Sequence, residues 1–282
     1  MRLLFITTIT MIAFAANSVF GRLALGSGAI DPAGYSLVRL GTGAIMLALL
    51  VAMRPGGSAL AARFSHGTWA SAAALFGYAA AFSFAYLWLD TGVGALILFA
   101  CVQGTMIGWS IAKGEHPTTL EWLGLAIAFA AFIWLVSPGL SAPDPAGAVL
   151  MALSGVAWGV YSLRGRGQAD PLAATAGNFV RSVPFAIVLV AFFLTRLEAS
   201  AWGIALATAS GAVTSALGYA LWYRALRELT PTQGAIVQLT VPAIATAGGI
   251  LFMGEVLTLR FIVCSVAILG GVAIAILARQ RR

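Results

Sequence analysis

The chain has 282 residues and a net charge of +7; 61% of its residues are hydrophobic and only 9% are charged. Because about a quarter of the residues in a soluble domain are charged, this composition excludes an ordinary water-soluble protein. The basic residues are scattered over the ends of apolar runs and form no patch, so a nucleic-acid-binding protein is not indicated either.

Ten apolar runs follow one another along the chain, each near the roughly 20 residues that a helix needs to cross a bilayer. They cover residues 3–25, 33–53, 68–88, 92–112, 119–137, 146–164, 173–195, 201–221, 232–252 and 258–278. The connections are short and hold nearly all the charge, which leaves no segment for a soluble domain. We therefore predict an all-α integral membrane protein of ten transmembrane helices, with the lipid bilayer as its surroundings.

The first run begins like a secretory signal peptide but stays apolar to about Leu25, so we expect it to be retained as the first span. The distribution of basic residues predicts orientation. The odd-numbered loops hold only Arg22, Arg196 and Arg260. The amino terminus, the even-numbered loops and the carboxyl tail hold eleven: Arg2, Arg54, Arg63, Lys113, Arg164, Arg166, Arg224, Arg227, Arg279, Arg281 and Arg282. We predict an inner-membrane protein with both termini in the cytoplasm.

A repeat is visible at an offset of about 140 residues. The pattern Gly-Glu-x-x-Thr occurs at residues 114–118 and again at 254–258, each time where an apolar run ends. At an offset of 142, Arg22 matches Arg164 and Arg39 matches Arg181. We predict two five-helix repeats, residues 1–140 and 141–282, the second inverted in the bilayer because five is odd.

Inverted repeats give two nearly equivalent conformations, one open to each side of the membrane, with a substrate site near the midplane between the halves. This arrangement favours a transporter working by alternating access. Duplication retained for stability alone, and a channel or sensor, are the alternatives. A channel would show conductance that substrate does not saturate.

Candidate substrate-binding residues are aromatic or carry an amide, and they lie within spans or, for Trp222, directly after one. They are Asn17, Tyr78, Phe82, Phe99, Gln103, Trp158, Tyr161, Tyr219, Trp222 and Gln238. Trp and Tyr near span ends are usually interface anchors, whereas Trp158 and Tyr78 lie well inside. Asn17 either lines a wet cavity or bonds a neighbouring helix.

Pro242 lies inside the ninth run, four residues after Gln238. A proline inside a helix removes one backbone hydrogen bond and displaces the carbonyl four residues earlier. A locally broken helix is tolerated in a membrane where it lines a cavity or is buried in protein. We predict a hinge at Pro242, with a simple bend for packing as the alternative.

Arg39 and Arg181 are the only charges placed well inside spans. Either they meet substrate carboxylates during entry or exit, or they pair with the backbone of a loop, which we favour. Cys101 and Cys264 fall within spans, so neither a disulfide framework nor a zinc site is indicated.

The nine acidic residues are placed in loops or at helix ends, and His66 and His116 are in loops. No cluster of these residues at helical spacing indicates an enzyme, a metal site or a cofactor. We predict transport that does not use a proton carried on an intramembrane carboxylate, unless Glu115 or Glu255 folds inward at the cavity mouth. We also expect a monomer.

Five plus five helices, the two Gly-Glu pairs, Arg39 and Arg181 in the second and seventh spans, and Trp158-Gly159 in the sixth resemble the drug/metabolite transporter superfamily, EamA type. Within it the chain is most similar to YddG-type exporters of aromatic amino acids. The resemblance implies inner-membrane export of amino acids and related metabolites through a cavity built by spans one, three, four, six, eight and nine. The Trp-Gly pair expected in the first span is Ala16-Asn17 here. A drug or lipophilic-cation exporter of the same fold is the alternative.

Overall fold

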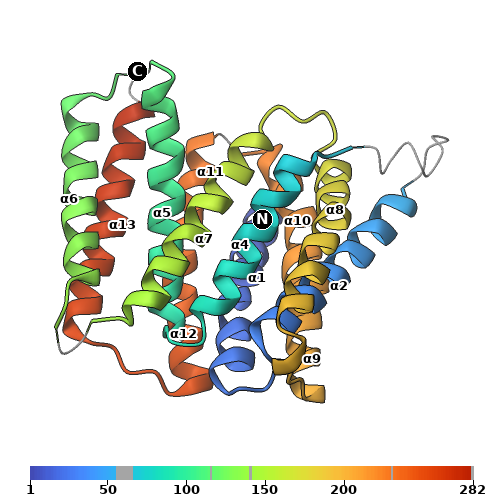
Figure 1. Cartoon of the computed structure of the whole chain (residues 1–282). Coiled ribbons are helices and arrows are strands. Elements are labelled where there is room, and N and C mark those ends of the chain that lie inside the picture. The colour runs from blue at the N-terminus through green and yellow to red at the C-terminus, as the bar shows by residue number, and fades with distance from the viewer. Residues whose placement is uncertain (55–65, 115, 140–141, 230, 281–282) are drawn as a thin grey trace.

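The computed structural model describes residues 1–54, 66–114, 116–139, 142–229 and 231–280. Its elements are α1 (Arg2–Gly26), α2 (Pro32–Ala52), α4 (Trp69–Ala85), α5 (Thr91–Ala112), α6 (Thr119–Val136), α7 (Pro145–Arg164), α8 (Pro171–Phe192), η1 (Leu194–Arg196), α9 (Ala201–Thr208), η2 (Ala209–Leu217), α10 (Gly218–Leu226), α11 (Pro231–Gln238), α12 (Val241–Met253) and α13 (Leu259–Gln280). Figure 1 shows the resulting helical bundle. The predicted all-α fold is confirmed. Glu115 and residues 140–141, where the predicted repeats meet, lie outside the described residues.

Nine helical stretches of the described chain are long and apolar enough to cross a membrane, and α4, with 17 residues, is shorter. The elements α9, η2 and α10 form one such stretch, and most of α11 forms another with α12. Large apolar side chains such as Phe129, Leu251 and Phe252 are exposed on the surface of the bundle. An apolar surface of this extent suits lipid rather than water. The protein is a multi-pass membrane protein.

Many helices begin at a polar side chain that accepts a hydrogen bond from the backbone of the first turn, as N-caps do. These caps are Asp31, Thr68, Thr118, Asp144, Asp170 and Ser200. Thr118 and Glu121 form a complete capping box, in which Glu121 Oε2 accepts from the Thr118 N–H at 2.6 Å. Several of the chain's few acids therefore serve to start helices.

Helices from the two halves pack in corresponding ways. The third span, α4, packs along the sixth, α7, while the eighth span (α9, η2 and α10) packs along the first, α1. Likewise α5 packs on α7 and α12 on α1, and α2 lies against α8. A two-fold axis between inverted repeats would produce these pairs. The packing is compatible with the predicted inverted repeats, which stay a prediction.

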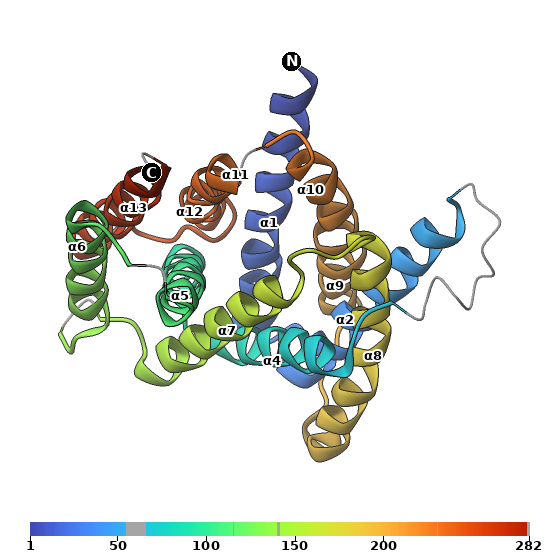
Figure 2. The same cartoon turned by 90° about the horizontal axis from the view of Figure 1, so that it is seen from above.

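The fifth and tenth spans, α6 and α13, stand together at one edge of the bundle (Figure 2). They cross at Gly124 and Gly271, where a Cβ atom on Gly124 would lie 2.4 Å from the carbonyl oxygen of Gly271. Small residues at such crossings let two membrane helices approach closely. The edge pair leaves the centre of the bundle to the other eight spans.

Two spans depart from regular α-helix. The chain turns at Leu239 and Thr240 between α11 and α12, with hydrogen bonds from these residues to the carbonyls of Ile236 and Val237, three residues back. This is the break that Pro242 predicted. The π-helical segment η2 in the eighth span was not predicted, and π-helical turns occur frequently at functional sites.

Candidate functional site

A cavity of about 700 Å³ lies between the two predicted repeats. It opens at the end of the bundle where α5, α7 and α10 finish, since its lining continues to Ser110, Gly165 and Leu229. We call this the basic end, because it carries Lys113 and Arg166 together with other arginines that the charge pattern assigns to the cytoplasm. The volume is within the range of about 300–1,000 Å³ found for small-molecule sites.

Six of the predicted site residues line this cavity and come from both halves of the chain. They are Gln103, Trp158, Tyr161, Tyr219, Trp222 and Gln238. The rings of Trp158 and Tyr219 are stacked, with centroids 5.3 Å apart and an interplanar angle of 19°. The ring centroid of Tyr161 lies 5.3 Å from that of Trp158, on the same helix. The wall therefore offers aromatic faces beside two amide groups.

Phe14 and Tyr223 also line the cavity and were not among the predicted site residues. The Phe14 ring lies 5.8 Å from the rings of both Tyr219 and Trp222, and the Tyr223 hydroxyl is 2.8 Å from Thr175 Oγ1. For Tyr223 the sequence held a signal of its place in the site, because it follows Tyr219 by four residues and so shares its helix face.

Tyr78, Phe82 and Phe99 are buried and lie outside the cavity lining in this structure. Tyr78 packs behind the wall, with its ring centroid 4.8 Å from that of Trp158, and Phe82 packs next to Tyr78 at 5.7 Å. Phe99 belongs to the apolar core. The expectation that these three rings line the cavity is not met here: they support the wall from behind or fill the core.

Asn17 also lies outside the cavity lining and connects two helices. Its Oδ1 accepts hydrogen bonds from Ser210 Oγ at 2.8 Å, Thr214 Oγ1 at 2.6 Å and Ser215 Oγ at 3.3 Å, all on η2. Its 5% exposure agrees with a contact between helices. Of the two roles left open for Asn17, the structure has the helix–helix contact, because the π-helical turn brings three hydroxyl groups to one oxygen.

Gln238 lines the cavity at the end of α11, directly before the break, whereas Pro242 is buried in the first turn of α12. The oxygen of Pro242 accepts a hydrogen bond from Thr246 Oγ1 at 2.7 Å. The break therefore begins at the cavity wall, whereas Pro242 itself lies outside the lining, and movement at this point stays a prediction.

The opposite end of the bundle is held by a polar network around Glu255, just after α12. Glu255 Oε1 accepts hydrogen bonds from both the N–H and the Oγ1 of Thr91, each at 2.8 Å. Arg22 on α1 lies 4.0 Å from the same oxygen and 3.6 Å from Asp90. The side chain of Asp90, just before α5, does not cap this helix. The carboxylate of Glu255 caps it instead, by accepting from the N–H of Thr91.

This Glu255 network connects α1, α5 and α12 where they meet. A small pocket of about 160 Å³ beside it reaches Asp90 and Glu255 but none of the aromatic wall. The sequence placed Arg22 and Glu255 near span ends without showing that they meet. The large cavity thus reaches the basic end and shares no lining residue with the small pocket at the opposite end, which we call the closed end.

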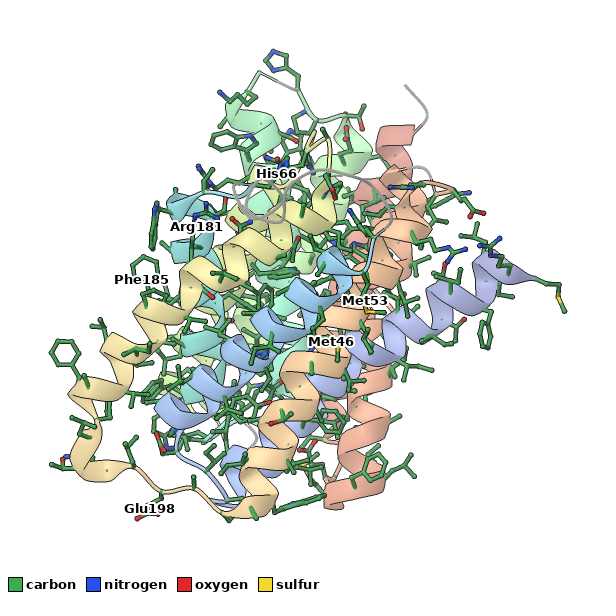
Figure 3. All side chains as sticks on the ribbon, turned by 90° about the vertical axis from the view of Figure 1, so that its right-hand side faces the viewer. Met46, Met53, His66, Arg181, Phe185 and Glu198 are labelled. Carbon is green, nitrogen blue, oxygen red and sulfur yellow. The ribbon has the colours of Figure 1, made fainter. Side chains whose placement is uncertain are left out.

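The two arginines inside spans have different partners. Arg181 Nη1 donates to the backbone oxygens of His66 at 2.8 Å and Gly177 at 3.0 Å, and Figure 3 shows Arg181 near His66. Arg39 is 2% exposed and donates to the Tyr78 hydroxyl at 2.8 Å. The favoured loop-backbone partner is therefore found for Arg181 and not for Arg39.

In the part of the chain that the structure describes, no group of three or more His, Cys, Asp or Glu side chains could hold a metal ion. Glu121 lines the cavity near its mouth, with its carboxylate in the capping box of α6. The described wall thus offers aromatic stacking and amide hydrogen bonds as its main chemistry.

Comparison with known proteins gives matches over the whole chain. The model of the EamA-like transporter family matches residues 145–277. An uncharacterised protein of Pseudomonas aeruginosa is 46% identical over 281 residues, which cover 100% of this chain and 96% of that protein.

More distant matches include the threonine/homoserine exporter RhtA of Salmonella typhimurium, 30% identical over 154 residues, covering 53% of this chain and 51% of RhtA. An uncharacterised transporter of Archaeoglobus fulgidus is 27% identical over 248 residues, 83% of each chain. A protein of known crystal structure aligns with 96% of this chain and 99% of its own, with a TM-score of 0.66 and 18% identity, which shows a shared fold.

Proposed function

The chain belongs to the EamA-like transporter family, and from this premise we propose that it exports amino acids, aromatic ones and related hydrophobic metabolites, across the inner membrane by alternating access. The observation that carries the proposal is the cavity between the halves, whose wall stacks Trp158 on Tyr219. An aromatic side chain of the substrate can pack against the faces and edges that these rings present to the cavity, while the amides of Gln103 and Gln238 bond its polar end. The name of the relative RhtA supports amino acids as the substrate class.

The finer assignments belong to the same proposal. The two inverted repeats are residues 1–140 and 141–282, both termini face the cytoplasm, and the protein works as a monomer. With this orientation the cavity opens to the cytoplasm, where an exporter loads its substrate. The YddG-like preference for aromatic amino acids rests on the aromatic wall and on the resemblance of the sequence.

Transport is expected to proceed without a proton carried on an intramembrane carboxylate. The described acids lie at helix starts, in loops or, for Glu255, in the network at the closed end, and Glu121, which lines the cavity mouth, has its carboxylate in the capping box of α6. Imposing a pH gradient on proteoliposomes with equal substrate on both sides should therefore produce no net accumulation. Accumulation that a protonophore abolishes would contradict this prediction and direct attention to Glu115 or Glu255.

Trp158→Ala is expected to weaken binding of phenylalanine and tryptophan about two- to tenfold more than binding of threonine. Trp158 is in contact with Tyr78, Tyr161 and Tyr219, and stacked aromatic pairs contribute about 0.5–1.5 kcal/mol beyond their buried area. Equilibrium binding of labelled amino acids to purified protein measures the difference.

Two controls accompany this variant. Trp158→Phe keeps a ring and should restore much of the preference, and Trp202→Ala removes an indole that is 61% exposed on α9, away from the cavity lining. Equal losses for all three amino acids in Trp158→Ala would show that Trp158 supports the fold and does not select the substrate.

A further inference from the structure

Arg39 is a buried charge without an acidic partner in the described chain. Its guanidinium lies 4.7 Å from the ring centroid of Phe82 and 5.1 Å from that of Tyr78. Nη2 donates to the Tyr78 hydroxyl, but Nη1 is buried and has no hydrogen-bond partner among the described residues. An arginine stays protonated in proteins, so this is a permanent positive charge with an unused donor.

A charge of this kind inside a membrane is costly and is characteristic of a functional site. Arg181, its counterpart at the offset of 142, shows how a structural arginine is accommodated, because its Nη1 bonds two backbone oxygens. The guanidinium of Arg39 instead contacts the faces of two aromatic rings and donates one hydrogen bond to a phenol. A purely structural role leaves the free Nη1 unexplained, whereas an anionic ligand would supply the missing acceptor.

Arg39 lies one aromatic layer behind the cavity wall. Tyr78, which accepts its hydrogen bond, packs against Trp158 on the wall, and Tyr219, another phenolic neighbour of Arg39, lines the cavity itself. Tyr35 on the same helix is also a neighbour; its buried hydroxyl lies beside Ser210, whose own hydroxyl donates to Asn17, and makes no hydrogen bond of its own within the described chain. Arg39 Nη1 and the Tyr35 hydroxyl are thus two unused buried donors, and their residues lie one helical turn apart on the same face of α2.

We propose that Arg39 and Tyr35 bind the carboxylate of the substrate as it passes from the cavity towards the closed end, when the ring of Tyr78 moves aside. The proposal rests on the amino-acid export proposed above and deepens it, because it makes a free carboxylate the feature that the protein recognises. A carboxylate can accept from Nη1 and from the phenol together. A lipophilic cation would meet an unneutralised guanidinium at the same point and be repelled.

The test compares phenylalanine with phenethylamine, which has the same ring and ammonium group but no carboxylate. Binding of both is measured on purified protein, and phenylalanine should bind the wild type more tightly. Arg39→Gln is expected to weaken phenylalanine binding about 10- to 100-fold, the effect of losing a hydrogen bond between charged groups, and phenethylamine binding by no more than about threefold. The ratio of the two affinities is independent of the amount of protein.

Further variants keep the test decisive if Arg39→Gln does not fold. Arg39→Lys keeps the charge without the planar donor pair and should give an intermediate ratio, and Tyr35→Phe removes only the hydroxyl and should lower phenylalanine affinity about three- to tenfold. Arg54→Gln is the matched control, because Arg54 pairs with Asp170 at 2.7 Å outside the cavity lining. It should leave the ratio unchanged.

The outcomes separate this proposal from the function on which it rests. If the wild type binds amino acids and Arg39→Gln lowers both affinities equally or neither, the carboxylate site is wrong and amino-acid export stands. If the wild type binds phenethylamine and cationic dyes but no amino acid, both proposals are wrong. A loss of affinity in Arg39→Gln that is confined to phenylalanine, the ligand with a carboxylate, supports the proposed site.

Discussion

Glu255→Ala is expected to open the end of the bundle that the structure closes. The variant removes two hydrogen bonds from Thr91 to a carboxylate, each worth about 1.5–3 kcal/mol, and the anion near Arg22. Because the link from Thr91 on α5 to the carboxylate just after α12 is then lost, the equilibrium should shift at least tenfold towards the state open at that end. Transport should slow accordingly, since a carrier biased to one state completes fewer cycles.

Cysteine labelling measures this shift. Val19→Cys reports on the closed end, because Val19 is 7% exposed and packs against α12 at Gly248, whereas Ala235→Cys reports on the cavity wall. With an impermeant thiol reagent, Glu255→Ala should increase labelling at position 19 and reduce it at position 235. Glu198→Ala, which removes an exposed acid at the same end, is the control. Unchanged labelling at both positions would mean that the Glu255 network does not hold the closed state.

Gly211→Val is expected to destabilise the protein strongly by separating α2 from η2. A Cβ atom at position 211 would lie 2.2 Å from the carbonyl oxygen of Arg39 and 2.2 Å from Thr42 Oγ1. The clash is with backbone, which cannot rotate away, so we expect a loss of about 3 kcal/mol or more, the upper part of the range for overpacked sites. Thermal unfolding in detergent, followed by size-exclusion chromatography, measures it as a lower midpoint.

The matched control lies on the same helix as Arg39. A Cβ atom at Gly41 would meet nothing within 4 Å, so Gly41→Ala should be neutral or stabilising by up to about 1 kcal/mol, the difference in helix propensity. Equal stability of Gly211→Val and the wild type would show that the close approach of α2 and η2 is absent in the protein.

The spans and helix starts could be predicted from the sequence because both depend on local patterns. Apolar runs near 20 residues long predicted the spans, and the caps found at Asp31 and Thr118 follow a local rule too, since each stands directly before the first residue of its helix. The break near Pro242 was also predictable, since proline acts on its own helix. The π-helical segment was not, because no residue type determines it.

The candidate site was only partly predictable, because its contacts join residues far apart in the chain. Spacing along one helix placed Trp158 and Tyr161 on a common face, and both line the cavity. The same reasoning could not show that Asn17 meets three hydroxyls on η2, nor that Tyr78 stands behind Trp158 and holds Arg39. Such contacts depend on how the two halves pack against each other.

The central claim, alternating-access export of amino acids, is tested most directly by counterflow in proteoliposomes. Vesicles loaded with unlabelled phenylalanine are diluted into labelled phenylalanine, and the label inside is followed over time. We predict transient accumulation of label above equilibrium, saturable and insensitive to a protonophore. Exchange of cationic dyes without exchange of any amino acid would contradict the claim and identify a cation exporter of the same fold.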